Sequence, residues 1–157
     1  MKYLWCTVGT KTYTFFGMRE LNVKEGMAQP RYRNLYHAFD QARISVSDTI
    51  ATNGKDGPID GLFTMRPSNT NIEIGVQSAV GTMTYGVLQS ALSGLAEAAT
   101  NYNPTNAPML FQINDGEWGE LGYGYAGYID NLGQCVYDIT PEITKACSDV
   151  TNKWVID

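Results

Sequence analysis

The sequence predicts a single α+β domain in which helices pack on an antiparallel or mixed sheet to form a layered sandwich. Three features predict this fold class: two long amphipathic helical segments, three pairs of short strand-like segments joined by turn-forming residues, and an internal repeat. The chain of 157 residues has the size of one domain and can bury most of the surface that its unfolded form exposes. We therefore expect residues 1–157 to form one domain.

The chain begins with a predicted hairpin and continues into a long helix. Residues 3–8 and 11–16 have strand-like composition, and Gly-Thr at 9–10 supplies the turn between them. From about residue 31 to 52, apolar residues recur at three- and four-residue steps, which gives a helix with one apolar stripe. The Asn-Gly pair that follows, ending at Gly54, favours a left-handed C-terminal stop.

A second hairpin and a second helix come next. Residues 62–66 and 72–77 are the predicted strands, and the run Pro-Ser-Asn-Thr-Asn between them is rich in turn formers. The second helix begins near Thr82 or Thr84, because either residue can cap it. It ends near Tyr102, because a proline two residues later cannot continue it.

Small residues are unusually frequent on the second helix outside its apolar stripe. Because glycine in a helix interior costs about 1 kcal/mol relative to alanine, we expect close packing to compensate for them. The expected neighbour is the sheet, and a helix–helix or homodimer contact is the alternative. The small residues are Gly86, Ser90, Ser93, Gly94, Ala96 and Ala98.

The last part of the chain predicts a third hairpin and a third helix. Strands at 109–113 and 118–125 flank an Asp-Gly pair at 115–116, which is the strongest short hairpin signal in the chain. Thr140 can cap a following helix in which proline takes the first position. Apolar residues then recur at helical spacing as far as Trp154.

An internal repeat relates the successive helices and strand pairs. Short matches, such as Leu-Phe-x-Met at 62–65 and Leu-Phe-x-Ile at 110–113, recur with a period of about 48 residues. We expect pseudo-repeats at about 11–54 and 62–104, followed by the C-terminal hairpin and helix at 109–154. The chain then consists of strand–strand–helix units duplicated within one globule, because so few copies do not make an open solenoid.

Composition and charge exclude several classes of partner. Hydrophobic residues make up 43% of the chain and charged residues 17%, and the net charge is −5. Sequence-independent nucleic-acid binding requires an excess of Lys and Arg, so we expect no nucleic-acid partner. No apolar run approaches the roughly 18 residues that a membrane span needs, so we expect no membrane span.

The N-terminus and the cysteines leave location and thiol chemistry open. The first residues lack the long apolar core and the cleavage site of a secretion signal, so the protein is either cytosolic or secreted after loss of a leader. Cys6, Cys135 and Cys147 allow one disulfide, for which Cys135–Cys147 is the main candidate, or three free thiols. Their spacing is not that of a zinc site, and we expect no metal or cofactor.

A glycine- and tyrosine-rich strand is the main candidate binding element. In its Gly-Tyr-Gly-Tyr-Ala run, side-chain alternation sends Tyr123 and Tyr125 to one face and leaves the other face nearly bare. Exposed tyrosines and the nearby Trp118 suit stacking on sugar rings or docking on a protein, with Asp115 and Glu117 as polar partners. The alternative is that both tyrosines fill an ordinary core and that the second helix packs on the glycine face.

The catalytic interpretations are weaker. Asp115, Glu117 and Glu120 crowd around the third turn, and glycoside hydrolysis uses such a pair of carboxylates, although charged residues at a turn mostly face water. His37 lies beside Asp40 on the polar side of the first helix, where a solvated surface histidine is the simpler interpretation. A Gly-x-Ser-x-Gly nucleophile motif does not occur.

Two segments resemble a known group of proteins. Residues 84–95, TYGVLQSALSGL, and 111–117, FQINDGE, are similar to small uncharacterised proteins of filamentous fungi, with the similarity covering the middle of the chain. The predicted architecture also resembles two classes of small fungal α/β sandwich, the mushroom lectins and the killer-toxin-like effectors. Those classes are usually disulfide-rich or carry a leader, which this chain does not show clearly. The resemblance implies a fungal source and secretion, and it implies no catalytic residue.

These features together predict a non-catalytic binding protein of a lectin-like or effector-like kind. Its expected ligand is a glycan or a surface partner, recognised by the exposed tyrosines and tryptophan. A carboxylate-dependent glycoside hydrolase is one alternative, and a toxin or protein-interaction module, including a homodimer, is the other.

Overall fold

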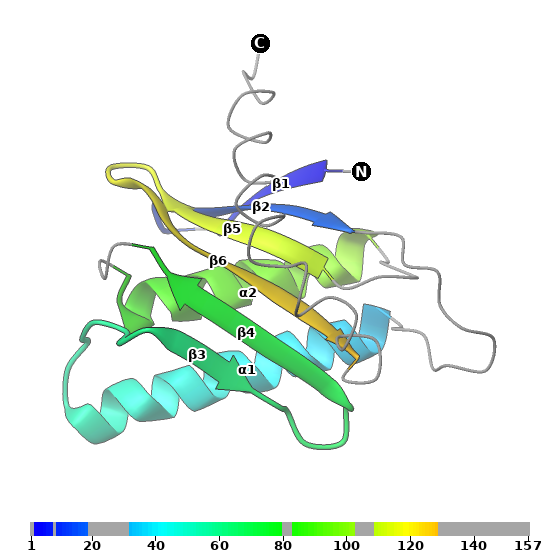
Figure 1. The fold of residues 1–157 in the computed structure, drawn as a ribbon, viewed down its shortest axis with the longest axis horizontal. Helices are drawn as coiled ribbons and strands as arrows, with labels where there is room; N and C mark the ends of the chain where they lie inside the picture. The colour runs from blue at the N-terminus through cyan, green and yellow to red at the C-terminus, as the bar shows by residue number, and fades with distance from the viewer. Residues whose placement is uncertain (1, 8, 19–31, 80–82, 103–108, 129–157) are drawn as a thin grey trace, which may run out of the picture.

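The structure, a computed structural model, describes residues 2–7, 9–18, 32–79, 83–102 and 109–128. Two helices and six strands occur in these residues (Figure 1). The α+β class predicted from the sequence is confirmed. In chain order the elements are β1 (Lys2–Cys6), β2 (Thr12–Met18), α1 (Tyr32–Asn53), β3 (Leu62–Met65), β4 (Ile72–Ser78), α2 (Tyr85–Tyr102), β5 (Met109–Asp115) and β6 (Gly119–Tyr128).

All the described strands belong to one sheet, in the order β1-β2-β5-β6-β4-β3. Every neighbouring pair is antiparallel, so the described sheet is antiparallel rather than mixed. The predicted hairpins are the pairs β1–β2, β3–β4 and β5–β6, and the pairs β2–β5 and β4–β6 join them. Among the described residues, β1 and β3 are therefore the two edge strands.

Both helices lie side by side on one face of the sheet (Figure 1). α1 packs against α2 and β4, and α2 packs against α1, β1 and β2. The strand side chains that alternate to this face are buried, among them Ile74 and Val76 of β4 and Phe111 of β5. Phe39 of α1 meets Phe111 edge to face, with 6.2 Å between the ring centroids. The hydrophobic core therefore lies between the helices and this face.

The helices begin and end close to the positions that the sequence predicts. α1 ends at Asn53, and Gly54 has a positive φ of 74°, as a left-handed C-terminal stop requires. Thr84 is the N-cap of α2, because its Oγ1 accepts a hydrogen bond from the backbone N–H of Val87 at 3.3 Å. Thr82, the other candidate cap, lies outside the described residues.

Two glycines of α2 have close neighbours within the chain. A Cβ at Gly94 would lie 2.5 Å from Oγ1 of Thr7 and 3.3 Å from Cδ1 of Trp5, so the first hairpin approaches the helix backbone closely. A Cβ at Gly86 would lie 2.6 Å from Oδ2 of Asp56, in the loop between α1 and β3. Close packing against the sheet, as predicted, accounts for Gly94, and neither glycine needs a second copy of the chain to explain it.

The third hairpin forms, but its connection is longer than a two-residue Asp-Gly turn. β5 extends to Asp115 and β6 begins at Gly119, so Trp118 lies in the turn and not on the strand as predicted. The left-handed residue is Gly119, with a φ of 76°, and not Gly116. The loop between the paired residues Asp115 and Gly119 has three residues, and a three-residue hairpin loop commonly combines a type I turn with a residue in the left-handed region at its end, which explains the difference.

Several predictions fall on residues outside the described structure. These are the third helix from Thr140 to Trp154 and the Cys135–Cys147 disulfide. Cys6 is described, and it is an exposed free thiol on β1. Neither α1 nor α2 combines the length and the apolar character that a membrane crossing requires.

Candidate binding site

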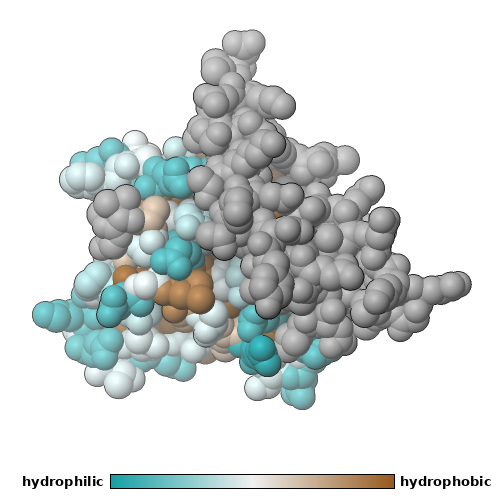
Figure 2. Space-filling model, viewed as in Figure 1, coloured by the Kyte–Doolittle hydropathy of each residue, from teal (hydrophilic) through white to brown (hydrophobic). Residues whose placement is uncertain are grey.

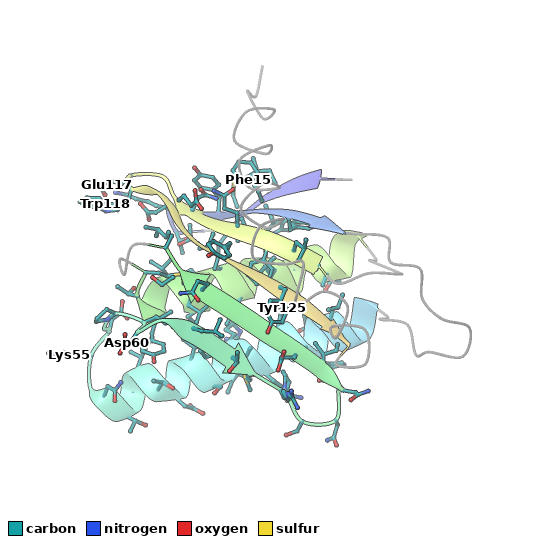
Figure 3. The ribbon with its side chains drawn as sticks, viewed as in Figure 1. Phe15, Lys55, Asp60, Glu117, Trp118 and Tyr125 are labelled. Atoms are coloured by element: carbon teal, nitrogen blue, oxygen red, sulfur yellow. The ribbon has the colours of Figure 1, made fainter. Side chains whose placement is uncertain are left out.

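The five residues predicted to bind a ligand fall in two separate places. Asp115, Glu117 and Trp118 belong to the turn between β5 and β6, residues 115–119, which we call the hairpin tip. Tyr123 and Tyr125 lie further along β6, on the side of the sheet opposite the helices, which we call the outer face and which is turned toward the viewer in Figure 2. Figure 3 shows Glu117 and Trp118 at the end of the hairpin and Tyr125 over the middle of the sheet. The structure therefore does not bring Trp118 and the tyrosines into one site.

The backbone of the hairpin tip is fixed by the side chain of Asp115. One carboxylate oxygen, Oδ1, accepts hydrogen bonds from the backbone N–H of Glu117 at 2.8 Å and of Trp118 at 3.2 Å. An aspartate that hydrogen-bonds the backbone two and three residues ahead stabilises a turn in this way. Asp115 therefore positions the tip, and this oxygen is already occupied.

The adjacent β1–β2 hairpin holds the tip from the side. The backbone N–H of Gly116 donates to the C=O of Lys11 at 2.9 Å, and Nζ of Lys11 lies 2.9 Å from Oε2 of Glu117. Both charged side chains are well exposed, so the ion pair itself contributes at most about 1 kcal/mol. The main effect of this ion pair is to orient the side chain of Glu117 at the hairpin tip.

Trp118 is the most exposed large hydrophobic residue of the described structure, with 75% of its surface accessible. The backbone N–H of Trp118 donates a hydrogen bond to Asp115, and the next residue, Gly119, has a left-handed conformation. A tryptophan at such exposure contributes little to the core, because burial is what makes large apolar side chains stabilising. The tip thus presents a flat apolar group to solvent on a fixed backbone.

On the outer face, Tyr125 belongs to a cross-strand polar network. Its hydroxyl donates a hydrogen bond to Oε2 of Glu73 at 2.9 Å, and Nε of Arg66 donates to Oε1 of the same carboxylate at 3.0 Å. The three residues come from β6, β4 and the end of β3, so the network ties together three neighbouring strands. Tyr125 is partly buried, and its polar end is occupied.

The ring of Tyr125 lies across Gly75 on β4. Tyr125 and Gly75 are directly paired in the ladder, and a Cβ at Gly75 would collide with the ring. Burial raises the pKa of the Tyr125 phenol from its ordinary value of 10.0 to about 12, and the hydrogen bond and the negative charge of Glu73 act in the same direction. The pairing therefore keeps the phenol neutral and fixed.

Tyr123 occupies the next cross-strand row of the outer face, between two glutamines. It is paired with Gln77 on one side and with Gln112 on the other, and it is partly buried. Gln112 is only 1% exposed, and its Nε2 donates to Oδ1 of Asn114 at 3.3 Å. Its Oε1 has no hydrogen-bond partner among the residues that the structure describes. One signal of this pair is visible in the sequence, since Gln112 and Asn114 alternate with buried apolar residues along β5.

The glycine side of β6 faces the core. A Cβ at Gly122 would lie 2.6 Å from the backbone oxygen of Gln77 and 3.0 Å from Cε of Met83. A Cβ at Gly124 would collide with the backbone oxygen of Gly75 and lie 2.7 Å from the ring of Phe111. The glycines are therefore accounted for by the close approach of β4 and of core side chains. The second helix is not what fills this face at these two positions.

The carboxylates of the third turn are not arranged like a catalytic pair. Asp115 supports the backbone, Glu117 is paired with Lys11, and Glu117 and Glu120 are exposed at the end of the hairpin. A general acid for glycosidic cleavage is normally held in a pocket that raises its pKa. The geometry therefore favours a role in the turn over a role in hydrolysis.

Other reactive groups are sparse in the described part of the chain. His37 is exposed on α1, its ring centroid 5.4 Å from that of Tyr36, as expected for a surface histidine. No group of three or more His, Cys, Asp or Glu side chains among these residues is placed to hold a metal ion.

Comparison of the chain with models of known protein families, with curated proteins and with solved structures finds no match.

Proposed function

We propose that this chain is a non-catalytic binding protein of a lectin-like kind and that the hairpin tip contacts its ligand. The proposal rests on Trp118, whose indole is 75% exposed on a turn fixed by hydrogen bonds to Asp115. Tryptophan is among the residues that contribute most to binding when an interface covers it. A fixed turn adds to this, because little conformational entropy is lost when a preorganised loop binds.

A glycan is the ligand class that the chemistry of the tip fits best. The flat indole can stack on the C–H face of a sugar ring, as an apolar surface next to polar groups. Glu117 supplies acceptor oxygens and Lys11 supplies N–H donors for the hydroxyls around such a ring. The carboxylates of Asp115, Glu117 and Glu120 outnumber the cation of Lys11 at the tip, so the surface beside the indole suits an uncharged sugar better than an anionic one.

In this proposal the two tyrosines of β6 support the sheet and are not the primary ligand contact. The hydroxyl of Tyr125 is engaged by Glu73, and its ring covers Gly75. Tyr123 lies in a row of amide side chains and is partly buried. Truncation of either tyrosine should therefore affect stability before it affects binding.

A glycan-array screen of the labelled protein tests the proposal. We expect selective binding to one glycan class, and we expect Trp118→Ala to weaken it by about tenfold or more, as truncation of a binding hot spot does. The matched control is Tyr36→Ala, which removes an exposed aromatic side chain from α1, far from the tip. Binding that survives Trp118→Ala would refute the site. An array without any signal would refute the glycan and direct the search to a protein ligand.

We also propose that the units α1-β3-β4 and α2-β5-β6 arose by duplication and form a layered sandwich with approximate two-fold symmetry. The two units have the same order of elements, and their last strands, β4 and β6, pair antiparallel side by side. A two-fold axis normal to the sheet would produce this pairing. Superposition of the two units in an experimental structure checks the idea, and different helix directions relative to the strands would contradict it.

Secretion from a fungal cell is the location that we propose, on the basis of the resemblance to fungal lectins and effectors. Mass spectrometry of culture medium and of washed cells from the source organism tests it. Recovery of the intact protein only from the cell extract would contradict it.

A further inference from the structure

The exposed edge of the sheet at β3 has a self-complementary sequence. Within the part of the chain that the structure describes, β3 is the last strand on its side, beyond β4. The segment from Asp60 to Arg66 reads Asp-Gly-Leu-Phe-Thr-Met-Arg, with one charge of each sign at its ends and neither charge nor proline within the strand. Natural edge strands are commonly protected by such residues against pairing with another chain. The four residues of β3 carry no such side chain, and Leu62 is 56% exposed.

The ladder between β3 and β4 determines which backbone groups of β3 face outward. The backbone N–H of Ser78 donates to the C=O of Gly61 at 3.3 Å, so these two residues form a hydrogen-bonded pair of the antiparallel ladder. Hydrogen-bonded and non-hydrogen-bonded pairs alternate along such a ladder. Phe63 therefore directs its N–H and C=O toward β4, whereas those of Leu62 and Thr64 point to the open side of the strand.

We propose that two copies of this chain associate through β3, antiparallel, about a two-fold axis that passes between the two Phe63 residues. In this register Leu62 of one copy lies opposite Thr64 of the second, and their outward backbone groups form the hydrogen-bonded pairs of a new ladder. The two phenylalanines face each other across the axis as a cross-strand aromatic pair. Asp60, which precedes the left-handed Gly61 before the strand, and Arg66, which follows the strand, then lie at the same end of the contact in opposite copies.

Charge selects this register over its neighbours. Alignments that pair Leu62 or Thr64 with itself use the same outward backbone groups, but they move Asp60 away from Arg66 of the second copy. Both side chains are exposed, and the hydrogen bond of Arg66 to Glu73 uses Nε, so its other guanidinium N–H groups remain to meet a second carboxylate. The interface is small, so we expect a weak dimer with a dissociation constant on the order of 0.1 mM.

Sedimentation velocity over concentrations from far below to far above that value tests the association. We expect a monomer–dimer equilibrium for the wild-type protein and a monomer for Thr64→Pro with an unchanged far-UV circular dichroism spectrum. Proline at this position removes an N–H that points outward and leaves the pairing with β4 intact. A wild-type protein that stays monomeric throughout, or a correctly folded Thr64→Pro that dimerises as the wild type does, would overturn the proposal.

A charge variant tests the same contact without proline. Asp60→Lys places a cation opposite Arg66 of the second copy, and we expect it to weaken dimerisation about tenfold or more. The matched control is Asp48→Lys, which makes the same change of charge at an exposed position of α1 and should leave the equilibrium within about twofold. Equal weakening by both variants would show that net charge, and not the β3 contact, controls association.

Disulfide trapping tests the register. In a background with the three native cysteines replaced by serine, a mixture of the Leu62→Cys and Thr64→Cys proteins should form a mixed disulfide faster than either protein forms one with itself. Paired residues of adjacent strands have the Cα separation that a disulfide needs, whereas Leu62 is displaced by two residues from its own counterpart. Equal rates in all three samples would refute this register.

Discussion

Single residues on the outer face act as matched pairs, and Gly75 with Tyr125 is the clearest of them. Glycine weakens a strand on its own, because it adds backbone entropy and no side chain to pack. Here the Tyr125 ring occupies the space that a side chain at position 75 would take. The hydrogen bond of its hydroxyl to Glu73 holds the ring there. The sequence shows both residues but does not show that they are neighbours, because the contact depends on the β4–β6 register.

Gly75→Ala should destabilise the protein by about 1–3 kcal/mol, because the new methyl group displaces the Tyr125 ring and its hydrogen bond. The same substitution in a Tyr125→Ala background should be neutral or stabilising by about 0.5 kcal/mol, since alanine then restricts the unfolded chain at no steric cost. Urea unfolding of the four proteins of this cycle measures the coupling. A cost for Gly75→Ala that is equal in both backgrounds would show that the ring is not the obstacle.

The phenol of Tyr125 should ionise later than an ordinary tyrosine, because its pKa is raised to about 12. In an ultraviolet pH titration, Tyr125→Phe should remove the change in absorbance near pH 12 that the wild-type protein shows. A pKa higher in the folded than in the unfolded state means that the native state binds the proton more tightly. The corresponding stability is therefore fully present below about pH 10 and is lost between about pH 10 and 12. A titration unchanged in Tyr125→Phe would contradict the assignment.

Among the elements, α2 depends on a side chain from the loop between α1 and β3, Asp56. Oδ1 of Asp56 accepts hydrogen bonds from the backbone N–H of Gly86 at 2.9 Å and of Gly57 at 2.8 Å, so a carboxylate sits at the positive end of the helix. A Cβ at Gly86 would lie 2.6 Å from Oδ2 of the same carboxylate, so a larger residue there would displace the Asp56 side chain. The loop and the helix thus stabilise each other.

Asp56→Ala should lower the free energy of unfolding by about 1 kcal/mol, as loss of a carboxylate at a helix N-terminus does. Lys55→Ala is the control, because it changes the exposed residue next to Asp56 without touching the helix end. Thermal unfolding followed by circular dichroism at 222 nm reports both variants. Equal melting temperatures for Asp56→Ala and the wild type would show that Thr84 alone suffices as a cap.

The helices and hairpins could be predicted from the sequence because each of them has a local signal. Periodicity and caps located both described helices, and turn formers located the three hairpins. The β2–β5 and β4–β6 pairings could not be predicted, because they join strands far apart in the chain and no local signal selects among them. The prediction of one site for Trp118 and the tyrosines is wrong for a local reason, because the turn is longer than an Asp-Gly pair and carries Trp118 away from the sheet face. The network of Tyr125, Glu73 and Arg66 likewise depends on these long-range pairings.

In the whole molecule, the two helix–strand–strand units are joined at β4 and β6 and by the contact of α1 with α2. Gly124 lies at the β4–β6 joint, where its α-carbon faces the backbone oxygen of Gly75 and the ring of Phe111. Neither neighbour can move alone, because one belongs to the β4 backbone and the other packs against Phe39 of α1. A larger side chain at position 124 must therefore displace atoms of both units.

Gly124→Ala should cost more than Gly75→Ala, near or above the upper end of the roughly 1–3 kcal/mol typical of overpacking, because backbone yields less readily than a tyrosine ring. If the joint makes the described structure one cooperative unit, far-UV circular dichroism and tryptophan fluorescence should shift to the same lower urea midpoint. Gly116→Ala is the matched control, since its new methyl group would lie 3.6 Å from the nearest atom, an ordinary contact at the hairpin tip. Separate midpoints for the two probes in Gly124→Ala would mean that the two units unfold independently. The β4–β6 pairing would then not make their unfolding cooperative.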